Sequence, residues 1–168
     1  MKTRAYLDIE TTGLSRSRAE LTVVGIAIER PTAMGEEPLD LIQLVSPEID
    51  EPGLYKSLES VDEIYTYNGS RFDLPFIKSS LQADLKTKFR HTDLMYHCWK
   101  RKLKGGLKSV ERQLKIERNL TEVDGYQAVV LWWQYINHND QNALKTLLEY
   151  NAEDVINLQH LRLKLSVD

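Results

Sequence analysis

The sequence predicts an α/β fold with a central mixed sheet of five strands, flanked by helices. Apolar, β-branched runs predict three strands near the N-terminus, and their short connections favour an antiparallel arrangement. Two further short strands alternate with helical segments, which favours parallel pairing because parallel strands need a crossover connection. Beyond residue 93 the apolar residues recur at spacings of three and four, which is typical of helices.

The N-terminal part of the chain, up to residue 92, carries all the predicted strands. The strands end at segments that break the apolar pattern, such as Asn68-Gly69 after the fourth. Residues 31–38 contain two prolines and Gly35 and predict a turn or loop. The predicted strands are residues 4–10, 21–28, 39–45, 64–67 and a short one near 89–92, with helices near 53–60 and over 72–82.

Helices fill the second half. They are predicted near 93–101, 107–114, 125–137 and 140–164, with glycine-containing breaks at Gly105-Gly106 and Asp124-Gly125. In the resulting topology the first strand is central, with the antiparallel pair on one side and the parallel strands on the other.

Composition limits the classes of protein to consider. The length of 168 residues fits a single domain, 1–168, without repeats or a low-complexity linker. With 22 basic and 25 acidic residues the net charge is −3, so any nucleic-acid contact must use a local basic patch. One cysteine, Cys98, excludes an internal disulfide and favours a reducing compartment. No apolar run is long enough to span a membrane and the N-terminus lacks a signal-peptide pattern, so we expect a cytoplasmic protein.

The most informative stretch is the end of the first predicted strand, which carries Asp8 and Glu10. Side chains alternate along a strand, so both acids point to one face and Ile9 to the other. Two carboxylates about 7 Å apart repel each other and resist burial unless a cation lies between them. Mg²⁺ suits such oxygen ligands, although a solvated strand with two exposed acids is an equally good explanation of this pair alone.

Asp73 follows the fourth strand and opens a helix. As a first-turn acid it would favour the helix dipole, and this role is compatible with a functional one. Because sites in open α/β sheets form at the C-terminal ends of parallel strands, Asp73 is expected near Asp8 and Glu10.

A third acid lies on the last helix, at Asp154. Tyr150 is four residues before it, on a face shared with Leu147 and Leu158, so both side chains point at least partly inward. An inward carboxylate is costly unless it is paired or bound to metal. A basic partner for Asp154 and ordinary packing for Tyr150 are the alternatives.

Together these segments resemble the DEDD, or DnaQ-like, 3′–5′ exonucleases of the ribonuclease H-like superfamily. Asp8-Ile9-Glu10-Thr11-Thr12-Gly13 matches the first motif of that family, Asn68-Gly69-Ser70-Arg71-Phe72-Asp73 the second, and Tyr150-x-x-x-Asp154 the third. The tyrosine places the chain with the tyrosine (DEDDy) subtype. The segments 106–111 and 125–129 also resemble a YprB-like branch of predicted exonucleases.

The resemblance implies a ribonuclease H-like fold and a site for two Mg²⁺ or Mn²⁺ ions. Asp8 would bridge both ions, Glu10 and Asp154 would complete the ion that activates water, and Asp73 would support the second ion. Tyr150 would orient the attacking water, because a phenol with an ordinary pKa of about 10 is a poor base at neutral pH. The expected reaction is the release of 5′-nucleotides from single-stranded 3′ ends of DNA or RNA.

Substrate contacts are expected from two groups of residues. By resemblance, Thr11, Gly13 and Leu14 line the terminal-nucleotide pocket, and Asn68 borders it. Arg71 precedes Asp73 by two residues and is a candidate phosphate contact. The basic run 100–108, with Lys102 and Lys104, is either a phosphate-binding patch or a solvated helix end.

Two other functional classes remain open. A domain of this fold could bind nucleic acid without cleaving it, although all four acids and the tyrosine are present. It could also be an endonuclease of the ribonuclease H type, which Tyr150 disfavours.

A zinc site at His91, Asp93 and His97 is disfavoured because their spacing suits no compact site.

Overall fold

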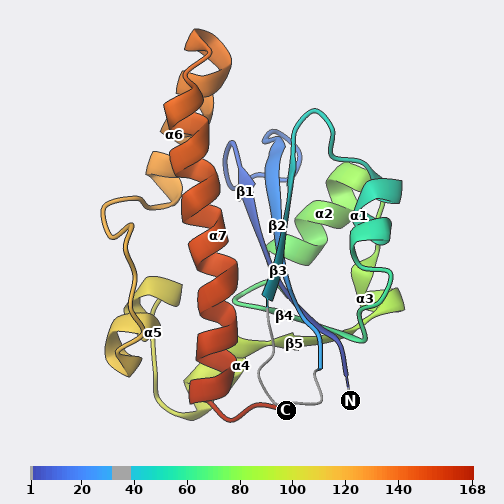
Figure 1. The fold of residues 1–168 in the computed structure, drawn as a ribbon, viewed down its shortest axis with the longest axis vertical. Helices are drawn as coiled ribbons and strands as arrows, with labels where there is room; N and C mark the ends of the chain where they lie inside the picture. The colour runs from blue at the N-terminus through green and yellow to red at the C-terminus, as the bar shows by residue number, and fades with distance from the viewer. Residues whose placement is uncertain (1, 32–38) are drawn as a thin grey trace.

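A computed structural model describes residues 2–31 and 39–168 of the chain (Figure 1). The predicted loop 31–38 lies, apart from Pro31, outside these residues. The elements are β1 (Arg4–Thr11), β2 (Leu21–Glu29), β3 (Leu39–Val45), α1 (Glu51–Ser57), β4 (Glu63–Thr66), α2 (Asp73–Leu81), α3 (Leu85–Lys88), β5 (Arg90–Asp93), α4 (Leu94–Lys100), α5 (Leu107–Leu114), α6 (Gly125–His138) and α7 (Gln141–Lys164).

The predicted fold class is confirmed: the five strands form one mixed sheet of order β3-β2-β1-β4-β5. β1 pairs antiparallel with β2 and parallel with β4, so it is the central strand. All predicted strands and helices are present with small shifts at their ends. The short helix α3 was not predicted, because its four residues Leu85–Lys88 are too few to show a helical period.

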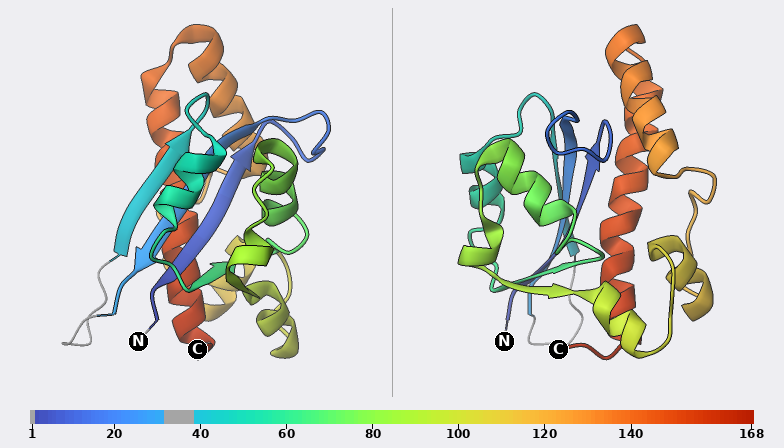
Figure 2. Two further views of the ribbon diagram at one scale, coloured as in Figure 1. Left: turned by 90° about the vertical axis from the view of Figure 1, so that its right-hand side faces the viewer. Right: turned by 180° about the vertical axis from the view of Figure 1, so that it is seen from behind.

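The two faces of β1 are covered by different layers (Figure 2). Leu7 and Ile9 point into the cluster that α1 and α2 cover, together with Ile64 and Phe76. Tyr6 points to the opposite face and packs with Val155 of α7. The alternation predicted for this strand is therefore present, and the even-numbered positions of β1, including Asp8 and Glu10, face α7.

The C-terminal part of α7 is fixed to the sheet by buried polar contacts. Arg162 donates from Nη2 to Glu29 Oε1 at 2.9 Å and from Nε to the Tyr6 hydroxyl at 2.6 Å. Glu29 lies on β2 and Tyr6 on β1, at the end of the sheet opposite to Glu10. This anchor sets the path of α7 across β1 and β2, and thereby the position of Asp154 two turns earlier.

A close approach between α7 and β2 occurs at Gly25, which pairs with Asp8 in the sheet. A Cβ built on Gly25 would lie 2.1 Å from Asn151 Oδ1, so only glycine leaves room for that side chain. The contact brings α7 against β2 at the residue that pairs with Asp8 of β1.

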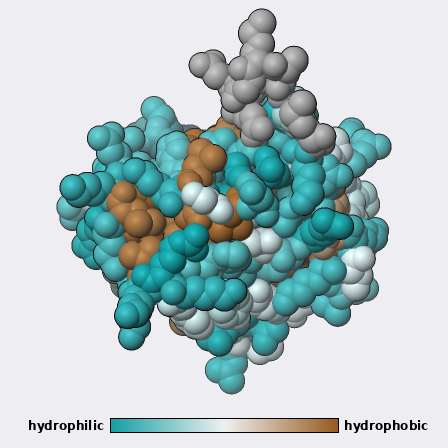
Figure 3. Space-filling view, turned by 90° about the horizontal axis from the view of Figure 1, so that it is seen from below, coloured by the Kyte–Doolittle hydropathy of each residue, from teal (hydrophilic) through white to brown (hydrophobic). Residues whose placement is uncertain are grey.

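The surface seen from below is mainly hydrophilic, with apolar side chains in separate small patches (Figure 3). Within the described residues, none of the helices has the length and apolar character that crossing a membrane requires.

We expect Gly25→Ala to lower the free energy of unfolding by about 1–3 kcal/mol, because the new methyl group must displace Asn151 and the helix that carries it. Urea unfolding followed by circular dichroism measures the change. Gly125→Ala is the matched control, since a Cβ there meets nothing within 4 Å and should change stability by less than about 0.5 kcal/mol. Equal effects of the two substitutions would contradict this account of Gly25.

Candidate metal centre

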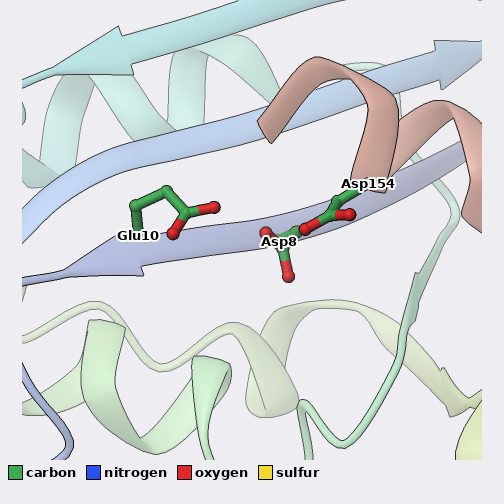
Figure 4. Close-up of side chains that lie close together, drawn as sticks. All are labelled: Asp8, Glu10 and Asp154. Atoms are coloured by element: carbon green, nitrogen blue, oxygen red, sulfur yellow. The ribbon is translucent and has the colours of Figure 1, made fainter. Parts of the chain in front are cut away.

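Three carboxylates from two elements converge beside the sheet. Asp8 and Glu10 project from β1 and Asp154 from α7, and the three side chains face one another (Figure 4). One oxygen atom from each lies within 4.8 Å of the others. Glu10 and Asp154 are buried and Asp8 is half-buried, so the group is largely withdrawn from water. This is a suitable arrangement for a cation that binds oxygen ligands.

Asp73 lies in the same cleft but outside that close group. It is buried at the start of α2, and its Oδ1 accepts a hydrogen bond from the backbone N–H of Ile9 at 3.2 Å. The proximity expected from parallel pairing of β1 and β4 is thus present. The backbone contact fixes Asp73 to the strand between Asp8 and Glu10.

Asp8 is oriented from α7 by an amide side chain. Asn151 Nδ2 donates to Asp8 Oδ2 at 3.2 Å, and Gln43 Nε2 of β3 donates to Asn151 Oδ1 at 3.0 Å. Asn151 is fully buried and occupies the space that Gly25 leaves open. Three strands and one helix therefore determine where the Asp8 carboxylate points.

Asp154 is paired with Arg118, from the segment between α5 and α6. The guanidinium also donates to Glu111 through Nε at 2.7 Å and Nη2 at 2.8 Å, and its Nη1 lies 3.7 Å from Glu153 Oε2. Asn157 Nδ2 donates to Glu111 Oε1 at 3.1 Å and holds that acid in place. A buried arginine thus compensates charge next to the cluster and leaves the other Asp154 oxygen available.

Burial and mutual repulsion alter the acidity of the whole group. Burial, followed by the charges of Asp154 and Asp73, raises the pKa values of Asp8 and Glu10 well above their usual range. Burial raises the pKa of Asp73 to about 7 and that of Asp154 to about 6, the latter despite the opposing effect of Arg118. Without a cation the cluster therefore holds protons near neutral pH, and a bound cation would displace them.

Tyr150 borders the cluster one helical turn before Asp154. Burial, followed by the charge of Asp154, raises the pKa of its phenol, so the hydroxyl stays protonated at neutral pH. The Lys108 ammonium lies 5.0 Å from the ring centroid, and the Arg118 guanidinium 5.8 Å. Lys108 Nζ is buried and has no hydrogen-bond partner among the described residues, so its charge acts on the site through space.

The four acids and Tyr150 line a cleft of about 640 Å³ at the C-terminal end of β1. Thr11, Gly13, Leu14 and Asn68, which the sequence predicts as substrate contacts, are among its lining residues. Leu14 is 86% exposed, and Tyr126 at the start of α6 is 73% exposed. The full lining is Asp8, Ile9, Glu10, Thr11, Thr12, Gly13, Leu14, Tyr67, Asn68, Phe72, Asp73, Gly125, Tyr126, Val129, Tyr150 and Asp154.

The other predicted substrate contacts lie outside the cleft. Arg71, Lys102 and Lys104 are exposed and are not among its lining residues. His91 and Asp93 make hydrogen bonds within the fold and are not arranged as ligands of one zinc ion. His91 Nε2 lies 2.9 Å from Thr66 Oγ1, and Asp93 accepts hydrogen bonds from the backbone of Asn68 and Ser70.

Several residues that shape the site were not identified from the sequence. Asn151 carried a usable signal, because it is a polar residue three positions before Asp154 on the inward face of a helix. Glu111 lies within a segment noted only for its resemblance. Lys108 was noted for that resemblance and as the end of the basic run 100–108, and not as a neighbour of the acids. Arg118 had no local signal, since its partners are seven to 36 positions away in the chain.

The donor set fits a hard divalent cation. All the available ligands are carboxylate oxygens, the acids repel one another, and no cysteine or histidine joins them within the described residues. Asp8, Glu10 and Asp154 could hold one ion directly, and Asp73 is a further carboxylate in the same cleft that is available to a cation.

Comparison with known proteins gives a match to the family model RNase_H_2, described as RNase_H superfamily, over residues 5–166. The uncharacterised protein YprB of Bacillus subtilis (strain 168) is 32% identical over 174 residues, which cover 96% of this chain and 41% of YprB. The chain therefore spans less than half of that relative's length.

Solved structures share the fold at a lower sequence identity than YprB. The family B DNA polymerase of Pyrobaculum calidifontis superposes with a TM-score of 0.69 at 16% identity, covering 99% of this chain and 25% of the polymerase. Brucella melitensis NrnC, solved with bound Mg²⁺ and bound to pGG, has a TM-score of 0.61 at 23% identity, covering 97% of this chain and 71% of NrnC.

The raised pKa values predict how stability depends on pH in metal-free protein. Ordinary aspartate pKa values are near 4, so between about pH 4 and 7 the folded state binds more protons than the unfolded state. We expect the free energy of unfolding to fall as pH rises through this window in EDTA, and to fall less with Mg²⁺ present. Urea unfolding at a series of pH values measures both.

Asp73→Asn serves as the comparison in this pH series, because it removes one group whose pKa rises on folding, to about 7. The variant should show a shallower pH dependence than the wild type in EDTA. Parallel curves for the two proteins would contradict the assignment of this titration to the cleft.

Arg118→Met tests the buried charge compensation. Removing one partner leaves Glu111 without its guanidinium in a dry environment, and we expect a loss of about 3–5 kcal/mol in urea unfolding. The control is Lys145→Met, which breaks an exposed pair with Glu149 and should cost less than about 1 kcal/mol. Similar losses in the two variants would show that Arg118 does not have this role.

Proposed function

Because the chain belongs to the RNase_H superfamily, we propose that it is a metal-dependent 3′–5′ exonuclease that hydrolyses phosphodiester bonds of DNA or RNA. The observation that carries the proposal is the convergence of four acids and Tyr150 in one cleft at the end of the central strand. A scaffold needs no such cluster, since mutually repelling buried carboxylates destabilise a fold unless a ligand compensates them.

The cleft suits Mg²⁺ or Mn²⁺, and two ions would neutralise the acids and polarise the scissile phosphodiester. Asp8, Glu10, Asp73 and Asp154 would hold the ions, and Asp8 is the ligand that the resemblance implies to be shared between them. The binding of Mg²⁺ and pGG by NrnC, which shares this fold, supports the same classes of cofactor and ligand.

Tyr150 has the role of a positioned hydroxyl. Its raised pKa keeps the proton on the phenol, so it orients the attacking water and does not act as the base. Water attacks phosphorus, the bond from phosphorus to the 3′ oxygen breaks, and a 5′-nucleotide leaves. Arg118 and Asn151 hold Asp154 and Asp8 in the orientation that this requires.

The mouth of the cleft supports recognition of a strand end. Leu14 and Tyr126 expose apolar side chains there, on the loop after β1 and at the start of α6. Such groups can contact the faces of terminal bases without reading their sequence. Thr11, Gly13 and Asn68 complete the lining beside the acids.

The proposal predicts that purified protein shortens a 5′-labelled single strand stepwise from its 3′ end in Mg²⁺ or Mn²⁺. We expect Asp8→Asn to reduce the rate by at least about 10³-fold and Tyr150→Phe by about 10²-fold. Glu149→Gln is the control, because this exposed residue adjoins Tyr150 but lies outside the cleft.

Three results would contradict this function. Undiminished activity in Asp8→Asn would show that the cleavage arises elsewhere. Cleavage of a circular strand at the rate of a linear one would indicate an endonuclease of the ribonuclease H type. Binding of strands without cleavage in either metal would indicate a non-catalytic nucleic-acid-binding domain.

A further inference from the structure

An aromatic and cationic surface lies beside the cleft, formed by two rings of α4 and by Arg71 from the segment before α2. Tyr96 and Trp99 are three residues apart on this helix, and their rings meet edge to face with centroids 5.4 Å apart. The Arg71 guanidinium lies 5.5 Å from the Trp99 ring and 6.0 Å from the Tyr96 ring. Trp99 is 43% exposed, so a large part of its indole is open to solvent. We call Arg71, Tyr96 and Trp99 the α4 platform.

The α4 platform is held at a fixed position relative to the cleft. Arg71 lies in the chain between Asn68 and Phe72, which both line the cleft. The buried carboxylate of Asp93 accepts hydrogen bonds from the N–H groups of Asn68 at 2.8 Å, Ser70 at 3.0 Å and Met95 at 3.1 Å. One acid thus joins the wall of the cleft to the start of α4, and the platform cannot move independently.

A basic loop continues from the platform. Lys100, Arg101, Lys102 and Lys104 follow Trp99 and are exposed. The Tyr67 hydroxyl, on the wall of the cleft, donates to the carbonyl of Gly105 at 2.6 Å and fixes the far end of this loop. In a chain with a net charge of −3, these cations are concentrated beside the cleft.

We propose that the α4 platform and the basic loop 100–104 form a second subsite for single-stranded nucleic acid, on which bases upstream of the cleaved nucleotide stack. The inference rests on the proposed nuclease function and adds the path of the strand outside the cleft. Exposed aromatic rings stack on any base, and an arginine over them adds a cation–π contact. The lysines would contact the backbone phosphates.

This geometry favours single strands over duplexes and over protein partners. A base must leave its helix to offer a face to Trp99, which a duplex does not allow without unpairing. The three aromatic and guanidinium groups give a small contact area next to several cations, which suits one or two stacked bases and their phosphates better than a protein interface.

The test measures binding without cleavage. Fluorescently labelled oligothymidylates of two to twelve nucleotides are titrated in Ca²⁺ with the full chain and followed by anisotropy. For the wild type, affinity should rise with length. In Trp99→Leu, which keeps apolar bulk but lacks the aromatic face, the twelve-nucleotide strand should bind about 10-fold more weakly, while the dinucleotide should bind unchanged.

Trp133→Leu is the matched control, because Trp133 is 41% exposed on α6 and should be replaceable without effect on either strand. A double substitution, Lys102→Gln with Lys104→Gln, should reduce the salt dependence of binding for long strands only. Circular dichroism and thermal unfolding verify that each variant is folded.

The subsite is excluded if wild-type affinity does not depend on length, or if Trp99→Leu weakens the dinucleotide as much as the long strand. Equal effects of Trp99→Leu and Trp133→Leu would also exclude it. Length-dependent binding that Trp99→Leu abolishes, in a protein that cleaves no strand in Mg²⁺ or Mn²⁺, would support the subsite and overturn the nuclease function alone.

Discussion

Repulsion among carboxylates at the end of β1 is the constraint on which the rest of the structure depends. Asp8, Glu10 and Asp154 lie with their oxygens within 4.8 Å of one another, and burial raises the pKa of each. Without a cation this arrangement is unfavourable, so the surrounding contacts must hold it. Because such a cluster lowers the stability of the fold, we expect it to bind a cation. The cation would supply the chemistry of phosphodiester cleavage.

The fold meets this constraint by fixing α7 against the central strands and against the segment between α5 and α6. Arg162 anchors its C-terminal part to Glu29, Asn151 enters the space left by Gly25, and Arg118 pairs with Asp154. Each contact is local, but together they determine where one helix crosses β1. The acids of the strand and the acid of the helix meet because this crossing is rigid.

The same wall of the cleft connects the acids to the proposed strand path. Asp93 caps α4 and accepts hydrogen bonds from the segment that precedes Asp73, so a displacement of α4 would also displace the cleft. This coupling gives a physical reason for an exposed Trp99 in that position. A rigid aromatic surface loses little conformational entropy when a base stacks on it.

The sequence alone determined the strands, the long helices, the central position of β1 and the acids that share the cleft. The elements and the proximity of Asp73 to Asp8 and Glu10 follow from local periodicity and from the rule that parallel strands end at one edge of a sheet. The meeting of Asp154 with these acids was implied by the resemblance of the three motifs. Only the tertiary structure decided which residues support those acids. Arg118 reaches Asp154 from 36 positions away, and nothing in its own segment distinguishes it from a surface arginine. It also decided that Lys102 and Lys104 lie outside the cleft, because the turn of the chain after α4, and not the number of cations, sets where a basic loop points.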